Sequence, residues 1–144
     1  MSALAPAEID ADVRELSAER CRELLELATV GRLGYVSSGG VQIVPLSYRA
    51  AGGVLYLRTR PGSLVDQLAE GGREVAFQVD SFTPGAGLAW SVLMQGRVQT
   101  LDAADLALVH DLQRAAMPWT GGHLRDLRFV PSSFSGRTIT HVDA

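Results

Sequence analysis

The stretch from Leu55 to Leu64 holds the side chains best suited to chemistry in this sequence. A strand-like run ends in Arg58 and Thr59, and a Pro-Gly turn then leads to Ser63 at the start of a predicted helix. A guanidinium, two hydroxyls and the free N–H groups of a helix N-terminus can together bind an anion. An ordinary strand-to-helix turn, with Ser63 as the capping residue, explains the same pattern. This stretch alone leaves both interpretations open.

Other catalytic and metal-binding patterns are missing from the sequence. The three histidines, His110, His123 and His141, show no short ligand spacing, and there is no hydrolase serine motif and no nucleotide-binding glycine loop. All 13 basic residues are arginine, so no lysine can form a Schiff base. We therefore predict no metal site, no lysine Schiff base, and neither hydrolase nor P-loop chemistry.

Length, charge and cysteine content set wider limits. The 144 residues suit one domain with a packed core, and a net charge of −3 without a basic tract argues against a nucleic-acid partner. The single cysteine, Cys21, excludes an intrachain disulfide and suits a reducing cytoplasm. No apolar run approaches the roughly 20 residues of a membrane span, and the acidic start does not read as a secretory signal. A cytoplasmic protein that does not bind membranes is expected.

The elements that would position the anion site follow from hydrophobic periodicity and turn residues. Cys21, Leu24, Leu25 and Ala28 repeat at helical spacing and predict a buried helix face, with Cys21 as a small core residue. Alternating apolar residues between glycine-rich turns predict strands. Ser17 and Asp102 are the predicted caps of the first and third helices, and Leu64, Val65, Leu68 and Ala69 are expected on the inner side of the second. The expected elements are a flexible leader over residues 1–15, a helix from Ser17 to Gly31, strands over 32–37, 41–49 and 54–59, a helix over 63–70, strands over 74–81 and 89–101, a helix over 102–116, and strands over 124–130 and 135–141.

These elements predict a mainly β fold of the α+β class. Six or seven antiparallel strands with two or three short helices favour a small barrel with the helices packed outside, formed by a single domain over residues 16–144. Pro45 interrupts the second strand and lacks a backbone N–H. It should therefore mark an edge, a bulge or a place where the sheet opens toward a ligand.

The order and spacing of several short motifs resemble the pyridoxamine 5′-phosphate oxidase-like family of split β-barrels over roughly residues 16 to 140. The motifs are Gly31-Arg32-Leu33-Gly34, Val44-Pro45, Arg58-Thr59, Pro61-Gly62-Ser63, Val75-Ala76-Phe77-Gln78-Val79-Asp80, Trp90-Ser91-Val92, Gly96-Arg97 and Gly136-Arg137. The resemblance implies a homodimer that binds flavin mononucleotide (FMN) at the subunit interface. It also implies oxidoreductase chemistry on a small molecule, in which the flavin carries the electrons.

The resemblance also implies which residues bind the cofactor. Arg58, Thr59 and Ser63 would hold the flavin phosphate. Val44, Pro45, Ser47 and Tyr48 would lie along the isoalloxazine ring, where their backbone groups can contact it. Trp90 would sit near the cofactor or the dimer interface, or else serve as a core aromatic residue. Gln95 and Arg97 would reach the polar edge of the ring or the phosphate, or else form a cross-strand polar pair.

One position departs from the family pattern. Members commonly read Gly-Ser-Lys at the phosphate loop, whereas this sequence has Leu64 after Gly62 and Ser63. Either Arg60 supplies the missing charge, with Arg58 and Arg60 binding the phosphate in fork geometry, or the flavin site has been weakened or lost. We expect retained binding of FMN. The alternatives are a reductase that uses the deazaflavin F420 and a non-catalytic protein that binds flavin, deazaflavin or heme.

Overall fold

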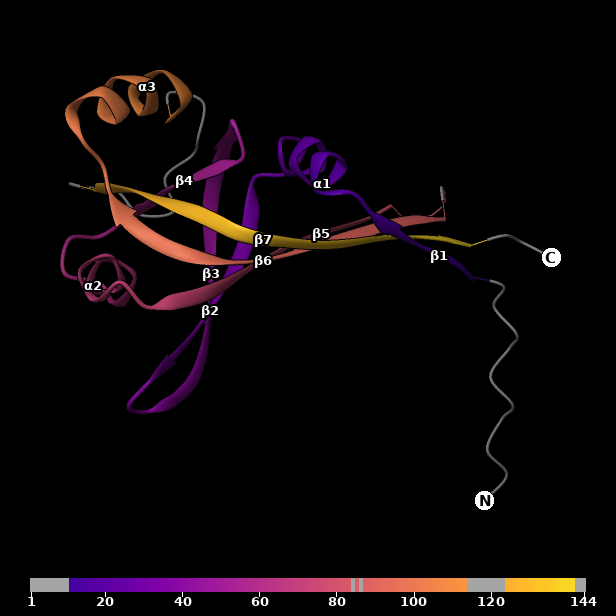
Figure 1. The fold of residues 1–144 in the computed structure, drawn as a ribbon, viewed down its shortest axis with the longest axis horizontal. Helices are drawn as coiled ribbons and strands as arrows, with labels where there is room; N and C mark the ends of the chain where they lie inside the picture. The colour runs from indigo at the N-terminus through magenta and orange to yellow at the C-terminus, as the bar shows by residue number, and fades with distance from the viewer. Residues whose placement is uncertain (1–10, 84, 86, 114–123, 142–144) are drawn as a thin grey trace.

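The computed structural model describes residues 11–83, 85, 87–113 and 124–141. Seven strands and three helices follow one another along the chain (Figure 1). In order they are β1 (Ala11–Leu16), α1 (Ala18–Leu25), β2 (Val30–Ser37), β3 (Gly40–Ala51), β4 (Val54–Thr59), α2 (Leu64–Gly71), β5 (Glu74–Thr83), β6 (Leu88–Thr100), α3 (Ala103–Gln113) and β7 (Arg125–His141).

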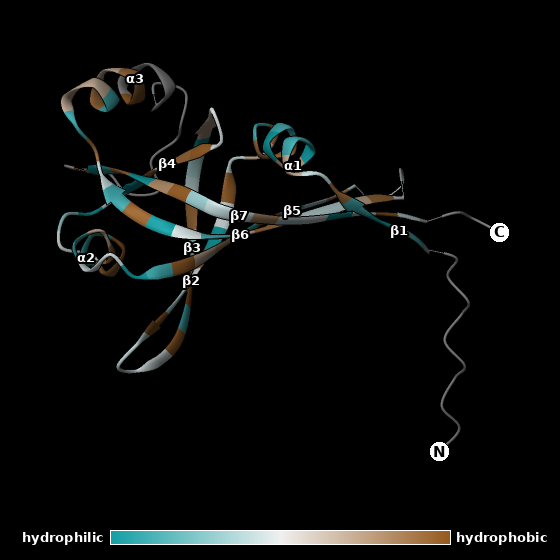
Figure 2. Cartoon of the chain, viewed as in Figure 1, coloured by the Kyte–Doolittle hydropathy of each residue, from teal (hydrophilic) through white to brown (hydrophobic). Residues whose placement is uncertain are grey.

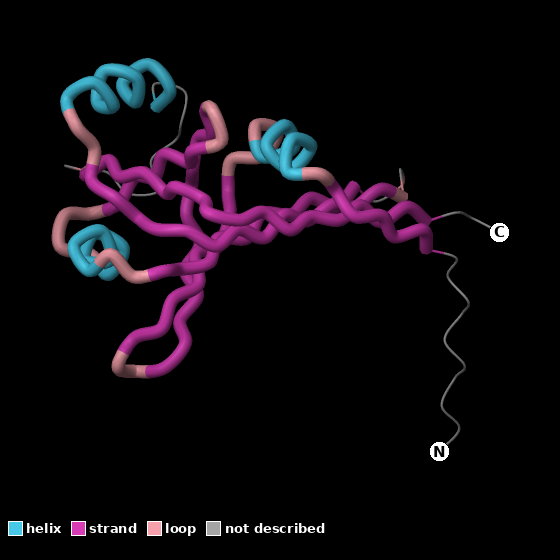
Figure 3. The backbone as a smooth tube through the Cα atoms, viewed as in Figure 1, coloured by secondary structure: helices cyan, strands magenta, loops and turns pink. Residues whose placement is uncertain are grey.

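All seven strands pair antiparallel in the order β1-β7-β4-β3-β2-β5-β6. An additional pairing of β6 with β7 closes six of them into a ring, and β1 attaches outside it to the end of β7. The helices lie around the strands, and β5, β6, β7 and β1 extend together as a long arm (Figure 3). The predicted barrel with helices outside is confirmed.

The core lies inside the ring and follows from alternation along the strands. On β6, Val92, Met94, Gly96 and Val98 are buried, while Leu93, Gln95 and Arg97 between them are exposed. Figure 2 shows that this strand carries both hydrophobic and hydrophilic bands along its length. Phe77 is the centre of an aromatic cluster, with its ring centroid 5.7 Å from that of Tyr48 and 5.5 Å from that of Phe129. Burial of this apolar surface supplies the main stabilisation of the ring.

Helix caps and buried helix faces agree with the sequence prediction. Ser17 caps α1 by accepting a hydrogen bond from the N–H of Arg20, and Cys21, Leu24 and Leu25 form its buried face. The carboxylate of Asp102 likewise accepts from the N–H of the third residue after it, at the start of α3. The helix α1 ends at Leu25 rather than near Gly31, because the chain turns there into β2.

Three further expectations need correction. Residues 11–15, expected in a flexible leader, belong to strand β1, because they pair in register with the end of β7. The two predicted closing strands are one strand, β7, which passes through Pro131 because a bulge opposite Gln95 and Gly96 accommodates it. Leu64, expected on the inner side of α2, is 55% exposed. Residues 1–10 and 114–116 of the predicted leader and third helix lie outside the described residues.

Candidate functional site

The end of β4 and the start of α2 form a corner with two hydroxyl groups in contact. The Oγ1 atom of Thr59 lies 2.7 Å from the Oγ atom of Ser63. Ser63 also caps α2, since its Oγ accepts from the N–H of Asp66 at 3.2 Å. The Arg60–Ser63 turn brings the two residues together through a backbone hydrogen bond and the left-handed φ of Gly62. The structure thus brings the two hydroxyls together at the N-terminus of α2, with Ser63 as the capping residue that the ordinary-turn interpretation expects.

A buried carboxylate, which the sequence analysis did not identify, lies under this corner. Asp66 is 8% exposed, and its Oδ2 accepts from the backbone N–H of Gly62 at 2.8 Å. Its Oδ1 forms an ion pair at 3.1 Å with Nε of Arg125, the first residue of β7. An acidic side chain is favoured in the first turn of a helix, where it faces the positive end of the dipole. Asp66 therefore holds the loop through the Gly62 N–H and links it to β7 through Arg125.

Arg58 takes a different direction from Thr59. The two are consecutive residues of a strand, so their side chains leave opposite faces of the sheet. Nε of Arg58 donates to Oδ1 of Asp126 at 2.9 Å, and these residues are direct partners between β4 and β7. The side chains are 30% and 11% exposed. The pair is thus partly buried, and Arg58 is held on β7 by its Nε atom.

The other two loop residues named from the sequence are open to solvent. Arg60 is exposed and makes no ion pair with any other described residue. Leu64 is the first residue of α2, with most of its side chain uncovered. Both positions border the hydroxyl pair of Thr59 and Ser63. A ligand bound at the corner would therefore meet Arg60 and Leu64 at its rim.

Strand β3 has an open edge beside this corner. Residues 40–47 pair with β2, whereas pairing with β4 covers Tyr48 to Ala51. Val44 and Pro45 thus lie on a stretch that pairs on one side only, in agreement with the edge predicted from Pro45. Val44 and Ser47 are partly buried and Pro45 is exposed.

Tyr48 belongs to the core. Its side chain is 1% exposed, and its hydroxyl donates to the carbonyl oxygen of Leu25 at 2.8 Å. Burial raises the pKa of Tyr48 above its usual range. Its backbone N–H donates to the carbonyl of Thr29. The side chain of Tyr48 is therefore not open to a ligand.

The three residues expected from β6 lie away from the hydroxyl pair. Trp90, 9% exposed, lines a small hollow in the arm together with Phe82 and Ile139. Gln95 is exposed beside the bulge of β7. Arg97 donates from Nη1 to the carbonyl of Gly72, at the opposite end of α2 from Ser63. Within one chain, none of the three hydrogen-bonds to the described residues of the corner.

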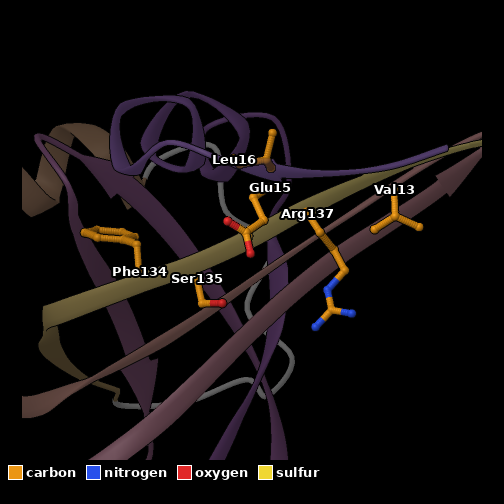
Figure 4. Close-up of a pocket in the computed structure, with 7 residues that line it drawn as sticks. Val13, Glu15, Leu16, Phe134, Ser135 and Arg137 are labelled. Atoms are coloured by element: carbon orange, nitrogen blue, oxygen red, sulfur yellow. The ribbon is translucent and has the colours of Figure 1, made fainter.

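A second hollow, of about 360 Å³, lies where β1 meets β7 (Figure 4). Glu15 and Arg137 are direct cross-strand partners there, and Phe134 borders the hollow. The guanidinium of Arg22 from α1 stacks over the Phe134 ring at 4.9 Å. Sequence reasoning missed this hollow because residues 11–15 were expected in a leader.

A family model described as pyridoxamine 5′-phosphate oxidase matches residues 17–138. A comparison with curated protein sequences gave no match. Within the described part of the chain, no helix is long and apolar enough to cross a membrane.

Several solved structures resemble this fold. A FAD-binding protein from Mesorhizobium loti is 27% identical with a TM-score of 0.77, and the match covers 91% of this chain and 99% of that one. The FAD binding protein from Mycobacterium smegmatis is 27% identical with a TM-score of 0.69, over 88% and 97% of the two chains. The FAD and heme binding protein from Mycobacterium smegmatis is 17% identical with a TM-score of 0.69, over 90% and 76%, and shares the fold.

Proposed function

Since the chain belongs to the pyridoxamine 5′-phosphate oxidase family, we propose that it binds a flavin nucleotide and uses it as an oxidoreductase on a small molecule. The observation that carries the proposal is the contact between Thr59 and Ser63 at the start of α2. Two similar structures are named as FAD-binding proteins, which supports a flavin. We propose FMN as the flavin, because its terminal phosphate monoester can accept hydrogen bonds from the hydroxyls of this corner.

The corner fits a phosphate in the chemistry of its donors. The hydroxyls of Thr59 and Ser63 can each donate to a phosphate oxygen once their mutual contact opens. The exposed guanidinium of Arg60 lies at the rim of the corner. Arg58 uses its Nε atom to bond Asp126, so its two terminal nitrogens are left to bind a phosphate. Arg58 begins on the opposite face from Thr59, so its contact with the phosphate requires its side chain to curve around the end of β4.

The open edge of β3 is the proposed platform for the flavin ring. At Val44 and Pro45 the strand pairs with β2 and not with β4, so backbone groups there can meet a planar ring. When bound, the flavin supplies two-electron transfer between a reduced donor and an oxidised acceptor. The protein residues then have to hold and orient the ring and exclude water. No side chain of the corner is needed as acid or base.

We propose that the working form is a homodimer with a site at the subunit interface. The β2–β3 hairpin exposes Val36, Val41 and Ile43 by 67%, 75% and 67%. These three side chains share one face, because Val36 and Val41 are direct partners and Ile43 lies two residues further along. Such an apolar strip on a protruding hairpin is typical of a protein contact. Trp90, Gln95 and Arg97 would then contribute to the site of the partner subunit.

Absorption and fluorescence titrations test the cofactor. Purified protein is titrated with FMN, FAD, riboflavin and F420 while its mass in solution is measured. We expect FMN to bind a dimer more tightly than riboflavin does, because riboflavin lacks the phosphate. Thr59→Val should remove much of this preference while leaving the weaker riboflavin affinity unchanged. A protein that binds none of the four compounds would contradict the proposal.

A second candidate is a flavin-binding protein without catalysis of its own. Leu64 favours it, because an exposed apolar residue stands at the position where the Gly-Ser-Lys pattern of the family resemblance has its lysine. This candidate is distinguished by reduction of the bound flavin. A protein that retains FMN but passes no electrons from NADPH, NADH or reduced F420 to any acceptor would support it.

A further inference from the structure

A positively charged side chain from a distant part of the sequence, that of Arg125, lies on the same face of the sheet as the corner of Thr59 and Ser63. Thr59 and Arg125 are direct partners between β4 and β7, so their side chains leave the same face of the sheet. On that face, Asp66 bonds the Gly62 N–H and pairs with Arg125, while Ser63 contacts Thr59. Arg125 therefore shares its face with the hydroxyl pair, whereas Arg58 leaves the opposite one.

The ion pair leaves part of the Arg125 guanidinium available. Asp66 meets it at Nε, and the two terminal nitrogens make no hydrogen bond to the described residues. The Arg125 side chain is 42% exposed and that of Asp66 is 10% exposed. One carboxylate oxygen of Asp66 accepts from the Gly62 N–H, and the other oxygen holds the Arg125 guanidinium in place. The planar fork of terminal nitrogens is then left to bind phosphate oxygens.

We infer that Arg125 supplies the phosphate-binding charge that Leu64 does not, and that Asp66 is its positioning residue. The inference rests on the proposed function, because it concerns the phosphate of the same flavin. A lysine at position 64 would extend from the first turn of α2, whereas Arg125 reaches the corner from the neighbouring strand. The positive charge of the site thus comes from a residue that lies 61 positions after Leu64 in the chain.

The test compares dissociation constants for FMN and riboflavin in four proteins. In Arg125→Gln we expect FMN affinity to fall by about tenfold or more and riboflavin affinity to stay within about twofold. The matched control is Arg128→Gln, which removes another ion-paired arginine of β7 whose partner is Asp105 of α3. It should leave both affinities unchanged. Adding Leu64→Lys to Arg125→Gln should restore most of the lost FMN affinity.

Three results would overturn the inference. Arg125→Gln could bind FMN as tightly as the unaltered protein, or lose FMN and riboflavin affinity equally, or fail to recover with Leu64→Lys. If Arg125→Gln does not fold, Arg125→Lys keeps a positive charge without the guanidinium fork, and the inference requires that it lowers FMN affinity. An unaltered protein that binds neither flavin would refute the proposed function itself. Binding of riboflavin and FMN with equal affinity would refute the phosphate site alone.

Discussion

The hydroxyl of Tyr48 on β3 donates a 2.8 Å hydrogen bond to the carbonyl of Leu25, the last residue of α1. This bond joins the first helix to the barrel core at a point that water does not reach. Tyr48→Phe removes the donor and leaves the Leu25 carbonyl without it. We expect a loss of about 1–3 kcal/mol in the free energy of unfolding, measured by urea denaturation. No loss would show that another donor reaches this carbonyl.

The same tyrosine makes stability depend on alkaline pH. Burial raises the folded-state pKa of Tyr48 above the value of about 10 in the unfolded chain. Its contribution to stability is therefore complete below pH 10 and declines as pH rises from there toward the folded-state pKa, because the unfolded chain ionises first. Urea denaturation at pH 8, 10 and 11 should show this decline. Tyr48→Phe should decline less steeply, and equal slopes would contradict the prediction.

Gly96 provides a sharp test of the β6–β7 bulge. A Cβ atom at this position would overlap the backbone of Val130 and Pro131 and the ring of Phe129. Since backbone atoms cannot move aside cheaply, Gly96→Ala should cost about 1–3 kcal/mol. Gly34→Ala is the matched control, because the nearest atoms to its Cβ lie 4.0 Å away. Thermal unfolding of the two variants checks this, and equal melting temperatures would contradict the described packing.

Leu64→Lys in the otherwise unaltered protein tests whether an added positive charge at the phosphate corner increases FMN affinity. The position is 55% exposed, so the substitution should leave the melting temperature nearly unchanged. Where Arg125 already serves the phosphate, we expect FMN affinity to rise by less than about tenfold, or about 1.4 kcal/mol. The control is Leu27→Lys, which adds the same charge at a site that is 74% exposed beyond α1. A larger rise that is specific to Leu64→Lys would indicate an eroded site.

The apolar strip of the β2–β3 hairpin gives a prediction about the dimer. Val41→Asp places a charge in the strip, at a residue that is 75% exposed in the single chain. We expect the mass in solution, measured by light scattering, to fall from dimer to monomer while the circular dichroism spectrum is retained. Leu108→Asp on α3 introduces the same charge at an exposed apolar residue outside the strip, and it should leave the dimer intact. A dimeric Val41→Asp variant would place the interface elsewhere.

Local signals in the sequence predicted most of the fold. Ser17, Ser63 and Asp102 cap the three helices, as expected from residue type and position. The bounds of β4 were predicted without error, because glycine and proline turns define both of its ends. Strand β1 was missed, since its charged residues show no apolar period and its order depends on pairing with β7.

The candidate site was predictable to a smaller extent. Thr59 and Ser63 lie within five residues of each other, so their contact follows from a short turn. Asp66 with Arg125, and Arg58 with Asp126, are pairs between distant segments. Such pairs depend on which strands become neighbours, and no local pattern in a single sequence contains that information.

Strand β7 has a consequence for how the chain reaches its native state. It pairs with β1, β4 and β6, and it follows all of them in the sequence. During synthesis the other six strands therefore emerge from the ribosome before the strand that closes the ring. Until then β4 and β6 each retain an unpaired edge, to which other chains can add. Closure over such long separations is slow, so this protein should depend on chaperones more than a helical protein of equal length.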